Sequence, residues 1–260
     1  MASLPQLEFF TRAGFAARGI MYGLIGFLAL RTGRNGDGAD ALQYLAGETG
    51  RIVLGLMAAG FLGYGLWRLS EAALDTEGHG SDAKGIAVRA GGAVSGLIHL
   101  GLAFVAVKLA AGSGGGGGNS AQEGTAMALG LPGGGLLVAA AGAILLVVGG
   151  WQIARAIRGD FLKHLDSRAA RREWVSWLGR GGYAARGIVF LAMAWFVAKA
   201  AWASDAGAAG GMGEALASLP DTVRTAVAAG LFLFGLFSLV EARHRKINDP
   251  AVIERLKAMR

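Results

Sequence analysis

The chain has 260 residues, of which 53% are apolar and 17% charged, with a mean hydropathy of +0.46 and a formal net charge of +7. Soluble domains carry about 25% charged residues, so this composition favours a membrane protein over a soluble fold. Cysteine is absent, which excludes disulfides, thiolate catalysis, Cys-ligated zinc and iron–sulfur clusters.

Six apolar stretches follow one another along the chain. A helix needs about 20 apolar residues to cross the hydrocarbon core, and several stretches reach that length only with a flanking Arg or Lys that snorkels to the interface. Backbone groups in lipid must be satisfied internally, so the spans are expected to be helices. The sequence therefore predicts an all-α integral membrane protein with six transmembrane helices, which lie at Gly14–Leu30, Ile52–Trp67, Ala90–Val107, Leu136–Ala154, Tyr183–Ala198 and Thr225–Val240.

Positive charge is unevenly distributed between these stretches. The connections at 109–135 and 200–223 contain no Lys or Arg, whereas the connection between the fourth and fifth stretches and the C-terminal tail are rich in both. The positive-inside rule then places both termini in the cytoplasm, in a plasma or inner membrane. This asymmetry accounts for most of the net charge, so no nucleic-acid partner is expected.

A two-helix unit occurs three times. Its first helix begins with the same Arg and Gly spacing at 12–19, 89–96 and 180–187, related by shifts of 77 and 91 residues, and the second helices align on 65–67, 149–151 and 235–237. Repeats that each add two spans share one orientation. We expect three parallel hairpins in a pseudo-threefold six-helix bundle, with a row of three hairpins as the alternative.

The repeats divide the chain into segments. Two connections differ from ordinary loops: a Gly-rich loop at 112–118 and a basic, amphipathic connector at 156–178. The predicted boundaries are 9–78 for repeat 1, 85–155 for repeat 2, 156–178 for the connector, 179–246 for repeat 3 and 247–260 for a basic cytoplasmic tail.

The repeated motifs also resemble a known family. Gly-Tyr-Ala-Ala-Arg-Gly at 182–187 and the segment from Gly230 to Arg245 resemble the domain-of-unknown-function 1206 family, uncharacterised bacterial membrane proteins with three tandem two-helix repeats. The resemblance implies the fold and assigns no activity. The chain departs from the pattern at His99 and His244, where tyrosine is expected, and at Val94-Ser95, which replaces Ala-Arg.

Two arginines lie inside the predicted spans. Arg18 and Arg186 are each six residues beyond the first Arg of their helix, about 9 Å deeper in the membrane. An intramembrane cation is costly unless it is paired or snorkels. Glu71 and Glu241 end the second helices of the same repeats, so we predict two ion pairs within repeats, Arg18–Glu71 and Arg186–Glu241. These pairs serve either as a folding clamp or as a site for an anion or a lipid phosphate.

The middle repeat has different polar residues. Ser95 replaces the intramembrane Arg, and Arg155 replaces the Glu. His99 is the only histidine within a span and aligns with aromatic residues of the other repeats, so we expect it to fill an aromatic packing slot, with a proton relay as the alternative. Ser95 and His99 are the candidates for a polar core.

The connector between repeats 2 and 3 carries apolar residues at helical spacing, including Phe161 and Leu165, beside basic ones. This pattern predicts an amphipathic helix that lies on anionic lipid headgroups at the cytoplasmic face. The alternative is a solvated linker with ordinary positive-inside charges.

Catalytic and cofactor motifs are missing from the sequence. It shows no Ser/His/Asp arrangement, no paired intramembrane carboxylates and no metal-ligand spacing, so we expect neither enzymatic activity nor a cofactor. The leading hypothesis is a structural or interaction role with a membrane-protein partner or a second copy of the chain. The alternative is a channel or carrier for a small, anionic solute or a lipid.

Overall fold

The computed structural model describes residues 4–32, 38–45, 50–75, 80–113 and 120–245. In these residues six helices are long and apolar enough to cross a membrane, which confirms the predicted fold class. The tail at 247–260 and most of the Gly-rich loop at 112–118 lie outside the described residues. The six helices are α1 (Leu4–Thr32), α3 (Gly50–Leu74), α4 (Ala83–Ala110), α6 (Gly134–Arg158), α8 (Glu173–Ala203) and α10 (Asp221–His244).

Short helices occupy the connections between the long ones. The four that lie outside the connector between repeats 2 and 3 pack against the long helices. These elements are α2 (Gly38–Tyr44), α5 (Ser120–Leu129), η2 (Ala206–Ala208) and α9 (Met212–Ala217), with η1 (Asp160–His164) and α7 (Ser167–Ala170) in the connector between repeats 2 and 3.

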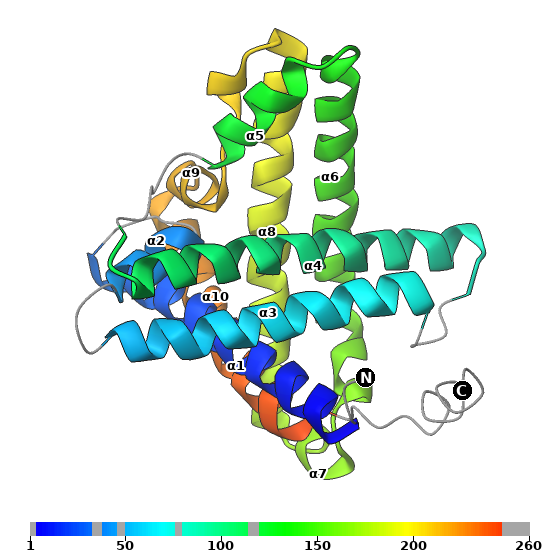
Figure 1. Cartoon of the computed structure of the whole chain (residues 1–260), viewed down its shortest axis with the longest axis vertical. Coiled ribbons are helices and arrows are strands. Elements are labelled where there is room, and N and C mark those ends of the chain that lie inside the picture. Colours follow the sequence, from blue (N-terminus) through cyan, green and yellow to red (C-terminus); the bar gives the residue numbers. More distant parts are fainter. Residues whose placement is uncertain (1–3, 33–37, 46–49, 76–79, 114–119, 246–260) are drawn as a thin grey trace.

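The long helices pack in a cyclic order. Within repeats 1 and 3 the two helices pack together as α1–α3 and α8–α10, and between repeats they pack as α3–α4, α6–α8 and α1–α10. Repeats 1 and 3 are therefore neighbours, as a pseudo-threefold arrangement requires and a row of hairpins does not. Figure 1 shows the α3–α4 pair running across the direction of the α6–α8 pair, with α1 oblique to both.

The ring is open at one edge, between α4 and α6 of the middle repeat. In the described residues these two helices lack the packing found at the other five edges. Repeat 1 brings α1 and α3 close because Gly14 and Gly60 have no side chains: a Cβ on Gly14 would lie 3.0 Å from the Gly60 carbonyl oxygen. In repeat 2 the equivalent of Gly60 is Ile144, which is 55% exposed, and a Cβ on Gly91 would meet nothing within 4 Å. We attribute the open edge to this bulky residue.

Aromatic rings fill the centre of the molecule. Tyr22 of α1 packs edge-on against Phe234 of α10, at 5.0 Å between ring centroids, and Tyr183 of α8 packs against the same ring at 5.3 Å. Ring–ring contacts of this kind add to the burial of apolar area. The largest fully buried aromatic side chains are Phe15, Phe61, Phe161, Phe234 and Phe237.

The connector does not form the predicted amphipathic helix on the membrane surface. Gly159, with φ of 71°, ends α6, and Phe161 and Leu165 turn into the protein, where they are 0% and 1% exposed. The Phe161 ring stacks on Tyr183 at 5.1 Å and occupies the space left by Gly179. The predicted amphipathic surface helix is therefore wrong, and the alternative of a solvated linker does not hold for Phe161 and Leu165, because both belong to the protein core.

A polar contact ties the connector to the end of α10. Asp166 caps α7 by accepting from the Ala169 N–H, its own N–H donates to the His244 carbonyl, and its carboxylate accepts from His244 Nδ1 at 2.9 Å. The Ala169 N–H and then the His244 ring lower the pKa of Asp166 below its ordinary value. The charged carboxylate therefore stabilises this junction.

Candidate functional site

Each repeat begins with an arginine that caps a helix of the neighbouring repeat. Arg12 of α1 donates to two carbonyls at the end of α10, at 2.9 and 2.6 Å. Arg89 of α4 donates to two carbonyls of α3, at 2.8 and 3.1 Å. Arg180 of α8 donates to two of α6, at 3.1 and 2.7 Å. The last carbonyls of a helix lack intrahelical partners and carry its partial negative charge, so a guanidinium stabilises each of the three ends.

About two helical turns deeper, the same three interfaces are built on glycine. A Cβ on Gly19 would lie 2.9 Å from the Gly235 carbonyl oxygen, one on Gly96 would lie 2.9 Å from that of Gly65, and one on Gly187 would lie 3.0 Å from that of Gly149. The glycines therefore let helix backbones of adjacent repeats touch, as small residues do in membrane helix pairs. The motifs that define the repeat mark the contacts between repeats.

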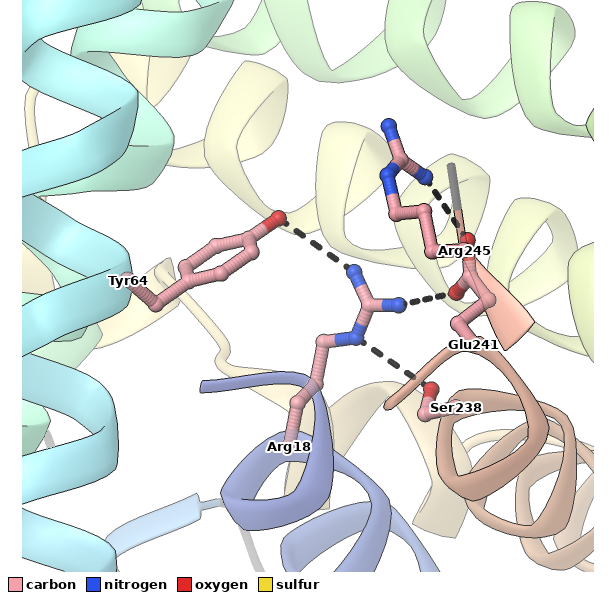
Figure 2. Close-up of polar contacts among 5 residues, drawn as sticks. All are labelled: Arg18, Tyr64, Ser238, Glu241 and Arg245. Carbon is pink, nitrogen blue, oxygen red and sulfur yellow. Dashed lines mark hydrogen bonds and ion pairs between the residues drawn. The ribbon is translucent and has the colours of Figure 1, made fainter. Parts of the chain in front are cut away.

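Arg18 lies at the centre of the interface between repeats 1 and 3. It is 8% exposed. Its Nη2 donates to Glu241 Oε2 at 2.5 Å, and its Nε donates to Ser238 Oγ at 3.2 Å. Its Nη1 lies 3.4 Å from the hydroxyl of Tyr64 on α3, and Arg245 donates to the second oxygen of Glu241 (Figure 2). The guanidinium therefore joins α1, α3 and α10.

The predicted pairing within repeats is wrong. The acid partner of Arg18 is Glu241 of repeat 3, not Glu71 of its own repeat. Glu71 is 0% exposed and accepts from Arg68, three residues earlier on α3, at 3.0 Å. Arg186 forms no ion pair with Glu241 and contacts Gln152 instead. The prediction chose the correct residue types but the wrong repeat.

The three interfaces carry different charges at the equivalent inner positions. Between repeats 1 and 3, Arg18 faces Ser238 and Glu241. Between repeats 2 and 1, the equivalents are Ser95, facing Arg68 and Glu71. Between repeats 3 and 2, they are Arg186, which contacts Gln152, and Arg155 at the position of the acid. Only the last interface combines two cations with no acid.

Arg186 is held by an amide and by aromatic rings. With the Gln152 amide oriented by its hydrogen-bond partners, its oxygen accepts from both terminal nitrogens of Arg186, at 3.2 and 3.3 Å. The guanidinium stands over the rings of Phe234, Tyr22 and Phe190, at 4.4, 5.2 and 5.2 Å. Its Nε is buried and finds no hydrogen-bond partner among the described residues. The Nε–H donor of Arg186 is thus left unused.

Ser95 and His99 face the interface between repeats 1 and 2. His99 Nδ1 donates to the Ser95 carbonyl at 2.7 Å, and its ring lies 4.5 Å from that of Tyr64 and 5.9 Å from that of Phe61. This is the aromatic slot that we expected. Nε2 is buried without a partner in the described part of the chain, so the ring can accept one hydrogen bond there.

The described residues show no cluster of three His, Asp or Glu side chains that would hold a metal ion.

Sequence reasoning missed two features of the site, the capping role of the first Arg of each repeat and the contact of Gln152 with Arg186. The internal alignment contained a signal for both, because the capped carbonyls and the positions 68, 152 and 238 are equivalent in the three second helices.

Comparison with known proteins agrees with this repeat structure. The family described as Domain of Unknown Function (DUF1206) matches three segments of the chain, at 13–75, 90–159 and 181–245. An uncharacterized protein of Bacillus subtilis, YxxB, is 31% identical over 257 residues, which cover 94% of this chain and 93% of that protein. No solved structure matches the chain. With one match in each of its three repeats, the chain belongs to the DUF1206 family.

Proposed function

We infer that this chain is a multi-pass membrane protein with a structural or interaction role rather than an enzyme. The observation that carries this inference is the use made of its intramembrane polar groups. Arg18, Ser238 and Glu241 bond to one another across two repeats and leave no free catalytic group between them. A catalytic site needs polar groups that converge on a substrate, whereas these three converge on neighbouring helices.

The packing of the centre supports the same inference. A channel or carrier needs a wet path or a polar midplane site. The central positions hold Phe61, Phe234 and Phe237, each 0% exposed, and glycine backbones in contact. A centre of this composition favours a protein whose function lies on its surface.

Its surfaces suggest what that role involves. The helices α4 and α6, beside the open edge, are the least buried of the six. Only 28% and 22% of the most apolar 18-residue segment of each helix is buried inside the protein. We propose that these faces meet lipid or a membrane-protein partner, including a second copy. Exposed Lys163, Arg168 and Arg172 of the connector would meet anionic headgroups in the cytoplasmic leaflet, with both termini on that side.

Flux measurements test this proposal against transport. The full chain is reconstituted into liposomes, and chloride and phosphate flux are measured beside protein-free liposomes. A structural role predicts equal flux in the two preparations. Anion flux above that background, abolished by Arg186→Ala in a variant that still elutes as a folded protein, would replace the proposal with an anion channel or carrier.

A further inference from the structure

Two arginines, Arg155 and Arg186, lie at the interface between repeats 2 and 3, and no acid stands at the equivalent positions there. Arg186 of α8 donates to Gln152 of α6, and Arg155 lies one turn further along α6 on the same helical face. No ion pair joins Arg155 or Arg186 to an Asp or Glu among the described residues, and both are partly exposed. From these observations, we propose that Arg155, Arg186 and Gln152 bind a phosphate oxyanion, such as that of an anionic phospholipid headgroup.

The equivalent interface shows what the cluster lacks. Between repeats 1 and 3, the carboxylate of Glu241 occupies the position of Arg155 and accepts from Arg18 at 2.5 Å. The chain thus supplies its own oxyanion, the Glu241 carboxylate, between repeats 1 and 3. Between repeats 2 and 3 the equivalent position holds a second cation, Arg155. Two guanidiniums beside an amide can hold a phosphate through charge-assisted hydrogen bonds from several directions.

Two features of the site point to an external ligand. The Arg186 Nε is buried and unpartnered, so a donor remains for an oxygen that the protein does not provide. Among the described residues, Arg155 makes a ring contact, standing 4.7 Å over Tyr183, and no ion pair, so its five N–H donors are not committed to a carboxylate there. A buried donor left without an acceptor, as the Arg186 Nε is, is costly, and a bound oxyanion would relieve that cost.

The position of the cluster fits a lipid headgroup. Arg155 lies one turn before the end of α6 at Arg158, close to the end that carries the basic connector. Exposed Trp174 and Trp177 at the start of α8 are residues typical of the level of the headgroups. A phosphate at this depth can belong to a lipid whose chains extend along the exposed face of α6.

Thermal unfolding of the purified full chain in a neutral detergent tests the site. Phosphatidylglycerol is added in one arm, zwitterionic phosphatidylcholine in a second, and inorganic phosphate at constant ionic strength in a third. We expect phosphatidylglycerol to raise the melting temperature and phosphatidylcholine not to. A shift with phosphatidylglycerol alone identifies a lipid headgroup as the source, whereas a shift with inorganic phosphate as well shows that a free anion is accepted.

Charge variants separate a built site from general attraction. Arg155→Glu recreates the Arg18–Glu241 arrangement, so it should weaken phosphatidylglycerol binding at least about tenfold and raise the melting temperature without lipid. Arg158→Glu makes the same charge change at an exposed position of α6 and should retain binding. Arg155→Gln removes the charge without adding an acid and should also lose binding, which keeps the test valid if the Glu variant fails to fold.

Two results would overturn the site: no shift with either phosphate ligand, or equal losses in the Arg155→Glu and Arg158→Glu variants. The inference goes beyond the proposed function and fails separately from it. Loss of the site would leave the contacts between repeats unchanged, whereas anion flux would overturn the proposed function.

Discussion

The Arg18–Glu241 pair gives the sharpest test of how the repeats are joined. Arg18→Ala removes the ion pair and the bonds to Ser238 and Tyr64. Among the described residues, it leaves the carboxylate of Glu241, which is 1% exposed, with the 2.9 Å bond from Arg245. Breaking a buried pair from one side costs about 3–5 kcal/mol. Because Arg245 remains, we expect a loss near the lower figure, about 3 kcal/mol, in the free energy of unfolding measured by titration with sodium dodecyl sulfate.

A pair of double-mutant cycles isolates the interaction from other effects of the substitution. The cycle of Arg18→Ala with Glu241→Ala should give a coupling energy of about 1–3 kcal/mol, because the two groups are in contact. The matched cycle of Arg18→Ala with Glu71→Ala should give less than about 0.5 kcal/mol, because Glu71 bonds to Arg68 instead. A larger coupling in the Glu71 cycle would refute pairing between repeats and restore the pairing within a repeat.

Three further predictions address the caps, the glycines and the connector. Arg89→Ala should lower the free energy of unfolding by about 1–2 kcal/mol in the same titration, because it leaves two helix-end carbonyls without their donors. Arg89→Lys should restore only part of this stability, because one ammonium replaces two guanidinium donors. Gly182→Ala, whose Cβ would overlap the backbone of α10, should lower the free energy of unfolding by about 1–3 kcal/mol. Gly91→Ala, beside the open edge, should leave it unchanged or raise it, because a Cβ there meets nothing within 4 Å. Equal losses in the two variants would contradict the open edge. Hydrogen bonds from the Ala169 N–H and the His244 ring hold the pKa of Asp166 below its ordinary 3.8, so its contribution to stability is present above that value and is lost as the pH falls through the lower folded-state pKa. The melting temperature should therefore fall more steeply from pH 6 to pH 3 for the wild type than for Asp166→Asn. Parallel curves would refute the stabilising role of the charged carboxylate.

The three repeats determine how much of this fold can be predicted from the sequence. The equivalent glycines at 19, 96 and 187 indicate close packing, and the structure places all three at helix contacts. The partner repeat could not be predicted, because three repeats in one register give the same pattern for contacts within a repeat and between repeats. Arg18 was therefore assigned to Glu71 when its partner is Glu241.

Two other features needed the three-dimensional arrangement. Phe161 and Leu165 have the spacing of a surface helix, yet both are buried. The Phe161 ring occupies the space left by Gly179, and that space exists only once α8 is placed beside the connector. The open edge had a sequence signal, since Ile144 replaces the Gly found at 60 and 230. That signal has meaning only when those glycines are known to contact the first helix of their own repeat.

Disulfide cross-linking tests the open ring most directly, because the chain contains no cysteine. Three equivalent cysteine pairs are introduced one at a time, at Ala17 and Gly60, at Ala185 and Gly230, and at Val94 and Ile144. In the first two pairs, a Cβ on the glycine would lie 3.1 and 2.5 Å from the alanine Cβ, so a small outward shift of the helices brings the two Cβ atoms to the roughly 3.5–4.5 Å of a disulfide. Val94 and Ile144 are 50% and 55% exposed on the separated helices α4 and α6. The account predicts cross-links in repeats 1 and 3 and none in repeat 2 after mild oxidation in membranes, and an equally efficient cross-link between positions 94 and 144 would contradict it.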